Sequence, residues 1–389
     1  MRYAPAVAPR PHRRVVESSL GCELALFHLD TRRLHVLNGP AAAIWQQLHV
    51  ADTIGDVAVG VGDVFGVSPI EIRGEIEETV DRLRADGLLQ IDDRFAPASA
   101  PSRPTRNGVV HVDAPAIGSY AALDARVGIE CDDEEMIAVI AAVLAPLHCD
   151  DDPSVSISIR EIDDGAWTVQ VADGEPVTLG SRLSVALRAI GEVNNLAVES
   201  AHRDLVLHAG AVAADGRGVL LPGGSNHGKS TLTTALVAEG FGYLTDEAAA
   251  VDTNLRIRPF AKSIALDPGS FSLFEELAPA NSADGLARAI ACREWHVDPE
   301  RVGTVSGSAP VAAIVCPQWR AGASTRVSEV EPVEALHLLL GDAFDFSCEG
   351  QIVFERLVLL ASTVPVVRLS YGDTAEAIEA VRAILDGVD

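Results

Sequence analysis

The stretch LLPGGSNHGKSTLTTAL, residues 220–236, constrains the fold of this chain more than any other. Within it, Gly223, Gly228, Lys229 and Ser230 have the spacing G-x-x-x-x-G-K-S. Glycines let the backbone turn tightly and point its N–H groups inward, and the N-terminus of a helix adds a positive end. The apolar run GVLL precedes the loop and the helix-like run KSTLTTALVAEG follows it. The stretch therefore predicts a phosphate-binding loop after a buried strand of an α/β domain.

The chemistry of this loop predicts ATP and Mg²⁺ as ligands. The lysine is expected to reach the β- and γ-phosphates, and the Ser230 hydroxyl is expected to bind Mg²⁺. Only two residues of the chain are lysines, Lys229 and Lys262. For Lys262, in RPFAKSIAL, two interpretations stay open: a role beside phosphate or acceptor, or an ordinary surface lysine. The predicted nucleotide contacts are Gly223, Gly224, Ser225, Asn226, His227, Gly228, Lys229, Ser230 and Thr231.

An acidic pair follows the next predicted strand. That strand, FGYLT, ends at Asp246 and Glu247. A strand–loop–helix–strand unit places the carboxyl ends of its two strands on the same edge of the sheet, so the pair is expected beside the loop. One acid can hold Mg²⁺ while the other accepts a proton from a hydroxyl. His208 ends the first strand of the predicted hairpin around Asp215-Gly216, and it is either structural or catalytic.

The first part of the chain predicts a smaller module, residues 15–93. Strand-like runs lie at residues 21–29 and 32–38, and three helices are expected at 41–48, 53–66 and 69–86. In the last helix Ser68 is the expected cap, and Ile72, Ile76, Val80 and Leu83 share a face. This order of elements indicates a winged-helix-like fold.

The rest of the chain is predicted to form a second domain. Residues 94–108, rich in Pro, Ser, Ala and Arg, are the expected linker. The second domain then spans 109–389, with its nucleotide-binding core at about 200–270.

Charge and cysteine content narrow the functional class. The net charge of −26 argues against general binding of nucleic acid or of an anionic membrane. The N-terminus has no apolar run of signal-peptide length, which predicts a cytoplasmic protein that makes no membrane contact. The six cysteines have no metal-ligand spacing, so reduced thiols are expected. They are Cys22, Cys131, Cys149, Cys292, Cys316 and Cys348.

Residues 200–385 resemble the HPr kinase/phosphorylase superfamily, and in particular its branch associated with peptide modification. The resemblance rests on a histidine ahead of a hairpin, a phosphate loop on the hairpin's second strand, and an acidic pair one short helix later. It implies that Asp246 is the general base, that Glu247 is a magnesium ligand in place of the family's usual Asp, and that His208 supports the pair. The Gly-rich signature of the HPr-specific enzymes is missing, so HPr itself is not the implied substrate.

Residues 17–92 resemble PqqD-like peptide-recognition domains. The resemblance rests on LFHLDTRRLHVLNGPAAAIWQQL and VDRLRADGLLQID. It implies that the leader of a ribosomally made precursor peptide adds a strand to the sheet edge at 33–37 and packs against the helix at 69–86. The acidic character of that helix argues against a DNA-binding winged helix.

Three functions remain open from the sequence. The first is a kinase that phosphorylates a serine of a precursor peptide held through its leader, with a homo-oligomer possible. The second is a kinase for free serine or another small alcohol. The third is a nucleotide-dependent peptide chaperone without transfer activity.

Overall fold

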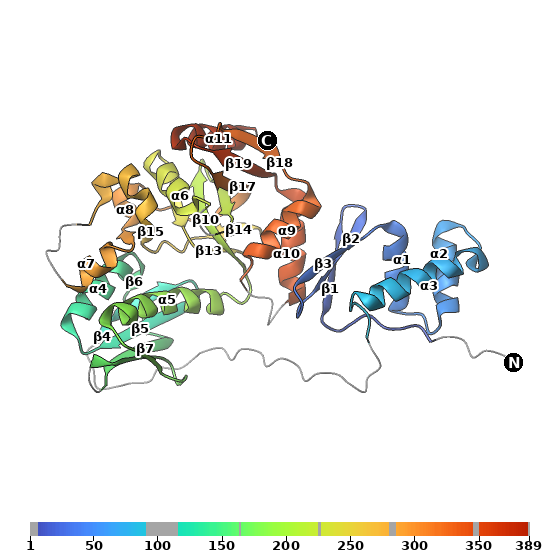
Figure 1. Cartoon of the computed structure of the whole chain (residues 1–389), viewed down its shortest axis with the longest axis horizontal. Helices are drawn as coiled ribbons and strands as arrows, with labels where there is room; N and C mark the ends of the chain where they lie inside the picture. Colours follow the sequence, from blue (N-terminus) through green and yellow to red (C-terminus); the bar gives the residue numbers. More distant parts are fainter. Residues whose placement is uncertain are drawn as a thin grey trace. The chain divides into compact units, whose positions relative to one another are not determined.

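In the computed structural model the described residues form two compact units (Figure 1). The front unit comprises the described residues within 7–90 and 350–362, and the main unit those within 116–344 and 363–387. The predicted linker, 94–108, lies outside the described residues. The described ranges are 7–90, 116–162, 165–224, 227–279, 285–344 and 350–387.

The front unit has a three-stranded antiparallel sheet, in the order β1-β2-β3, with helices packed on one face. Its second and third strands and its first three helices are those expected from the sequence. Their apolar side chains, among them Trp45, Ile76 and Leu83, form one buried cluster. The elements are β1 (Val15–Leu20), β2 (Glu23–His28), β3 (Arg33–Leu37), α1 (Gly39–Leu48), α2 (Ile54–Phe65) and α3 (Pro69–Ala85).

Local sequence explains how two of these helices begin and end. Thr53 and Asp56 form a reciprocal capping box at the start of α2. Pro69 starts α3, where its missing N–H costs nothing. Ser68 was expected to cap α3, but its side chain accepts no hydrogen bond there, so that prediction is wrong. Gly87 follows α3 in the left-handed conformation that commonly ends a helix.

A helix from the far end of the chain completes the front unit. Helix α10 (Gly350–Thr363) packs on the sheet, where the rings of Phe27 and Phe354 stack with centroids 5.7 Å apart. The Gln351 side chain binds the backbone of Glu17 in β1: its Oε1 accepts from the N–H (3.2 Å) and its Nε2 donates to the carbonyl (2.7 Å). This placement was not predicted, because the helix lies within the predicted second domain.

The main unit begins with a six-stranded sheet in the order β6-β4-β5-β7-β8-β9. Helices α4 and α5 cover it with a continuous apolar core. The sequence runs VSISIR and WTVQV lie in its strands β7 and β8. The elements are β4 (Ala116–Ala122), β5 (Ala125–Cys131), α4 (Glu134–Leu144), β6 (His148–Cys149), β7 (Val155–Glu161), β8 (Trp167–Val171), β9 (Val177–Leu179) and α5 (Arg182–Ser200).

The main unit continues with an eight-stranded sheet that carries the phosphate loop. Its strands follow the order β11-β10-β13-β14-β17-β19-β18, β12 pairs with β10, and β11 also pairs with β17 in parallel. Helices α6 and α11 share one apolar core with it. The elements are β10 (Leu205–Ala214), β11 (Arg217–Pro222), α6 (Lys229–Ala238), β12 (Gly242–Thr245), β13 (Ala248–Val251), β14 (Arg256–Arg258), β17 (Ala309–Trp319), β18 (Arg326–Glu329), α9 (Pro332–Asp342), β19 (Val366–Tyr371) and α11 (Thr374–Asp386).

Short elements link these strands. A two-stranded ribbon beside α6 pairs Ile264 with Val297 and Leu266 with Trp295. The elements are β15 (Ile264–Leu266), η4 (Pro268–Leu273), η5 (Glu275–Leu277), α7 (Leu286–Ala291), β16 (Trp295–Val297) and α8 (Pro299–Val302).

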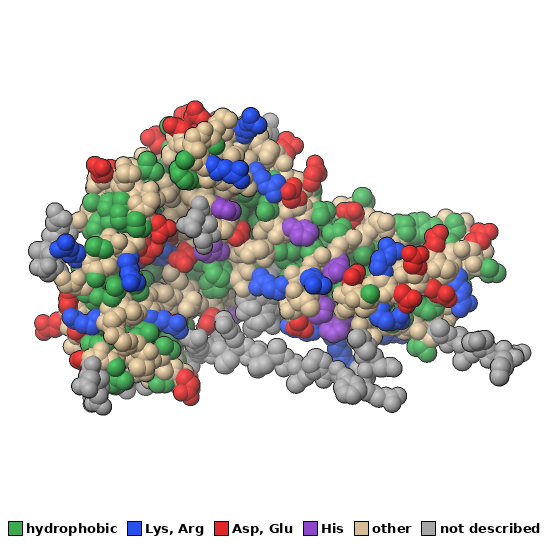
Figure 2. All heavy atoms as spheres, in the orientation of Figure 1, with side chains coloured by type: hydrophobic (Ala, Val, Ile, Leu, Met, Phe, Trp, Pro, Cys, Tyr) green, Lys and Arg blue, Asp and Glu red, His purple; other side chains and the backbone are tan. Residues whose placement is uncertain are grey.

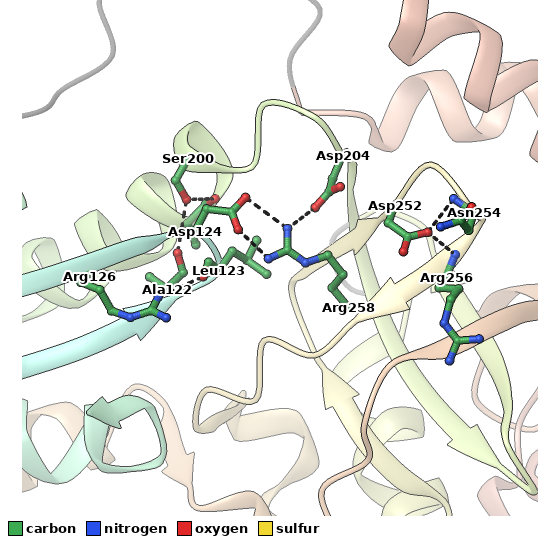
Figure 3. A network of polar contacts seen from close by, with 11 residues as sticks. Ala122, Leu123, Asp124, Arg126, Ser200, Asp204, Asp252, Asn254, Arg256 and Arg258 are labelled. Atoms are coloured by element: carbon green, nitrogen blue, oxygen red, sulfur yellow. Dashed lines mark hydrogen bonds and ion pairs between the residues drawn. The ribbon is translucent and has the colours of Figure 1, made fainter. Parts of the chain in front are cut away.

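Arg258 links the eight-stranded and the six-stranded sheet of the main unit through ion pairs (Figure 3). The guanidinium of Arg258, on β14, binds Asp124 in the β4–β5 turn through two nitrogens, at 2.6 and 3.1 Å. It also binds Asp204, just before β10, at 2.5 Å. This forked pairing fixes the sheet that carries the loop against the sheet that precedes it.

The surface agrees with the acidic composition. On the face in Figure 2, acidic and basic side chains are interspersed, and no broad basic patch is seen among the coloured residues. Among the helices described, none is both long enough and apolar enough to cross a membrane.

Candidate functional site

The hairpin that leads into the phosphate loop is the one predicted. Strands β10 and β11 pair antiparallel from Ala209–Pro222 to Ala214–Arg217. The turn residues Asp215 and Gly216 both have positive φ, at 51° and 74°, as a two-residue hairpin turn requires. The hairpin therefore delivers the chain to the loop from a buried strand.

Two glycines allow the loop and its helix to pack closely. Gly228 precedes α6 with φ 85°, and a Cβ there would lie 2.7 Å from the Tyr371 hydroxyl. Gly210 faces α6 from β10, and a Cβ there would lie 2.4 Å from the Thr233 hydroxyl. Any larger residue would push the helix away from the strand.

The loop lysine is buried inside the loop. The Lys229 ammonium donates to the carbonyls of Gly223 and Gly224, the second at 3.1 Å. Burial lowers its pKa, against the opposing influence of nearby carboxylates. The Ser230 side chain is partly exposed at the start of α6, and the Thr231 hydroxyl bonds Ser270 at 2.6 Å. The predicted contacts Ser225 and Asn226 lie outside the described residues.

The acidic pair lies at the same sheet edge as the loop. Strand β12, which leads to the pair, and strand β11, which leads to the loop, both run antiparallel to β10 and so parallel to each other. Ala209 of β10 pairs with Pro222 at the end of β11, and its N–H donates to the carbonyl of Glu247 (3.0 Å). The two segments therefore meet at one edge, although β10 lies between the two strands.

Asp246 is almost completely buried and is held by three donors. Its Oδ1 accepts from the Tyr243 hydroxyl (3.0 Å) and from the Lys262 ammonium (2.8 Å). Its Oδ2 accepts from the backbone N–H of Ala265 (2.8 Å). A carboxylate has about four acceptor positions, so at most one remains for another partner.

Glu247 and His208 are the more accessible neighbours. The Glu247 side chain is 38% exposed, and its Oε2 accepts from the Asn194 amide (2.9 Å) and lies 3.3 Å from the Lys262 ammonium. His208 pairs opposite Ala248, directly after the acidic pair. Burial, followed by the charge of Lys229, lowers the pKa of His208 and favours its neutral form.

Lys262 belongs to this site, so the surface-lysine interpretation is wrong. The residue is 6% exposed and bridges Asp246 and Glu247. Burial alone would lower its pKa, but the two carboxylates outweigh burial and raise it. Its positive charge offsets part of the negative charge of the pair.

Three ionisable residues near the site were not singled out from the sequence. Asp342, at the end of α9, receives the backbone N–H of Gly223, and burial raises its pKa. Glu294 lies 3.2 Å from His296, and the ribbon that carries His296 pairs it with Ala265. Burial, opposed by Lys262 and reinforced by Asp246, raises the pKa of Glu294 to about 7. Burial together with the charge of Lys262 lowers the pKa of His296 to about 4.

The oxygen donors at this edge fit a magnesium ion bound together with phosphates. Within the described ranges, no group of three or more His, Cys, Asp or Glu residues could hold a metal ion alone. Mg²⁺ usually takes one or two carboxylates and completes its shell with phosphate oxygens and water. Glu247 and the Ser230 hydroxyl are the donors that this edge offers.

Comparisons with known proteins bear on both units. Residues 23–89 match the family model of coenzyme PQQ synthesis protein D (PqqD), so the N-terminal segment contains a PqqD domain, as the sequence predicted. No curated protein matches the chain.

Two solved structures are among the matches. One is TbiB1 in complex with the TbiA(beta) leader peptide, with 18% identity and a TM-score of 0.20, covering 23% of this chain and 99% of that one. The other is the Hpr(Ser) kinase/phosphatase from Coxiella burnetii, with 12% identity and a TM-score of 0.24, covering 46% of this chain and 94% of that one.

Proposed function

We propose that this chain is an ATP- and Mg²⁺-dependent kinase. Its acceptor is a serine hydroxyl of a ribosomally made precursor peptide, captured through its leader by the front unit. One observation carries the proposal: Ala209 touches both the strand that ends at the phosphate loop and the acidic pair. A loop that holds a triphosphate and carboxylates that meet a hydroxyl are the two parts that phosphoryl transfer needs.

The loop amides and Lys229 hold the β- and γ-phosphates. Ser230 and Glu247 hold Mg²⁺, which neutralises charge on the transferred group. Neutral His208, beside the pair, supports its position. The acceptor hydroxyl approaches from the side of Asp246 and Glu247, where one carboxylate takes its proton.

The division of work between the two acids is open to a direct test. The resemblance assigns the proton to Asp246, and we keep that assignment as the first candidate. Its three donors leave it little free capacity, whereas Glu247 is exposed and has fewer partners. Glu247 is therefore the second candidate for the base.

The PqqD domain supplies the peptide side of the proposal. Strand β3 pairs with β2, and no other strand among the described residues pairs with it. An extended leader can add a strand at residues 33–37 and pack against α3. Tethering raises the local concentration of the core peptide, so the catalytic site needs little affinity of its own.

The test is transfer of label from ATP in the presence of Mg²⁺. The acceptors are a synthetic precursor peptide with its leader, the same peptide without the leader, and free serine. Label on the leader-bearing peptide alone supports the proposal. Label on free serine alone would indicate a small-molecule kinase, and ATP binding without transfer would indicate a chaperone.

Paired variants assign the base. We expect Asp246→Asn to reduce transfer by about 100-fold or more, the usual contribution of a positioned proton acceptor, while ATP still binds. Glu247→Gln is the matched variant, and it is expected to raise the Mg²⁺ concentration needed for activity. If Asp246→Asn retains full activity and Glu247→Gln loses it at saturating Mg²⁺, the base is Glu247.

A further inference from the structure

The carboxyl ends of three parallel strands meet at the edge that carries the phosphate loop. β11 pairs in parallel with β17, and β17 pairs in parallel with β19 up to Trp319–Tyr371. Ligands of open α/β sheets bind outside such strand ends. The residues that follow β17 and β19 therefore share the edge with the end of β11 and the start of α6.

Trp319, the last residue of β17, contacts the loop directly. Its backbone N–H donates to the carbonyl of His227 (3.3 Å). A Cβ on Gly228 would lie 3.1 Å from the Cβ of Trp319, and the Tyr371 hydroxyl donates to the Gly228 carbonyl (3.4 Å). The backbone of Trp319 is thus fixed against the phosphate loop.

The side chain of Trp319 is nevertheless exposed. It is 48% exposed, whereas Trp45 and Trp167 are at most 4% exposed and Trp295 stacks on Phe271. A single exposed aromatic residue is unremarkable on most surfaces. Because its backbone lies beside the predicted phosphate loop, this exposed indole is a candidate contact for a group attached to phosphates bound there.

The turn that follows Trp319 is tightly fixed. The Arg320 N–H donates to the Tyr371 carbonyl (2.9 Å), and Gly322 has φ 72°. A Cβ on Gly372 would lie 2.6 Å from backbone atoms of Ala323, so the turn packs directly on the end of β19. The indole is therefore held on a preorganised backbone, which lowers the entropic cost of binding.

We propose that Trp319 is the stacking platform for the base of the nucleotide whose phosphates lie in the loop. The inference rests on the proposed function, because it takes the loop's ligand to be a nucleotide. Aromatic side chains stack on any base through its π-face, so Trp319 contributes affinity without base selectivity. It gives the loop a way to prefer a nucleoside triphosphate over inorganic phosphates.

The test compares two probes, Mg²⁺·ATP and inorganic tripolyphosphate with Mg²⁺, by calorimetry on the full chain. Trp319→Ala is expected to weaken ATP binding by about 5- to 150-fold, the range for loss of one base stack. Tripolyphosphate binding should stay unchanged, and Trp319→Phe should retain most of the ATP affinity. Val327→Ala is the matched control. It truncates a 45% exposed residue on β18, which pairs with β19, and it should change the affinity for neither probe.

Other outcomes would overturn the inference and leave the kinase proposal standing. Unchanged ATP affinity in Trp319→Ala is one, and an equal loss of both probes, which would make Trp319 a support of the loop, is another. Reduced transfer with unchanged ATP affinity would place Trp319 on the acceptor side instead. If the unaltered protein binds neither probe, the proposed function itself fails, and Trp319 has no base to stack on.

Discussion

The two units leave different parts of a sheet open. In the front unit the open part is the side of β3, which presents backbone N–H and C=O groups. In the main unit it is the carboxyl ends of β11, β12, β17 and β19, where loops and charged side chains converge. A strand edge suits an extended peptide of varied sequence, and strand ends suit a compact charged ligand. If the proposed function holds, the chain separates its two kinds of ligand by the part of each sheet that it leaves uncovered.

The largest expected effect is on the pH dependence of main-unit stability, to which Glu294 and His296 contribute. In the main unit the folded-state pKa of Glu294 is about 7, above its ordinary 4.5, so this residue alone would make stability fall as pH rises from about 4.5 to 7. The folded-state pKa of His296 is about 4, below its ordinary 6.5, so the histidine alone would make stability rise from about 4 to 6.5. The two contributions oppose each other, so their sum should change little with pH in the shared range.

A substitution of either residue should leave the pH dependence contributed by the other. His296→Asn should make stability fall with rising pH, and Glu294→Gln should make it rise, with slopes of at most about 1.4 kcal/mol per pH unit. Solvent screening of the partly exposed Glu294 will reduce these values. The charged groups that face Glu294 are Lys262, Asp246, Asp267 and Glu247. Hydrogen exchange of main-unit amides at several pH values is the measurement, and equal slopes in both variants would contradict the pairing.

The next prediction tests whether the leader peptide binds β3 through hydrogen bonds to its backbone. His28 directs its carbonyl toward the β3 side, where it accepts from Arg32, and Leu29 directs its N–H to Arg14 beside β1. Along an antiparallel strand, the backbone N–H and C=O groups of successive residues point alternately toward the partner strand and away from it. On β3, His35 therefore bonds to β2, and the N–H of Val36 points away from the sheet. Proline is tolerated at such an outward position.

Val36→Pro should therefore weaken binding of the leader peptide while the front unit stays folded. Loss of one hydrogen bond is worth about 1 kcal/mol, or roughly fivefold in affinity. Val36→Ala keeps the N–H and is the matched control. Calorimetric titration with a synthetic leader decides the matter: equal loss in both variants would indicate recognition through the side chain, and loss in neither would move the peptide to another surface.

Local patterns made part of this architecture predictable. The Asp215–Gly216 turn, the helix that starts at Lys229 and the apolar face of α3 depend on neighbouring residues, so the sequence alone was sufficient for them. The burial of Lys262, the approach of Asp342 to Gly223 and the contact of Trp319 with the loop depend on segments far apart in the chain. For the same reason the sequence did not indicate which core α10 would join.

The smallest expected effect concerns Gln351, which binds the backbone of β1 at the other edge of the front-unit sheet. Gln351 occupies the outward N–H and C=O of Glu17, so β1 cannot pair with a further strand there as β3 can. Gln351→Ala should cost about 1 kcal/mol of front-unit stability and speed hydrogen exchange at the Glu17 amide, because two bonds to exposed backbone are lost. Ile352→Ala, at an exposed position of the same helix, is the control and should leave hydrogen exchange at that amide unchanged.

The Gln351→Ala variant should still bind one leader peptide per chain, since β3 is unaltered. A second equivalent bound to Gln351→Ala would show that this single side chain keeps the sheet from accepting peptide on both edges, whereas unchanged exchange at Glu17 would mean that β1 is protected by something other than Gln351.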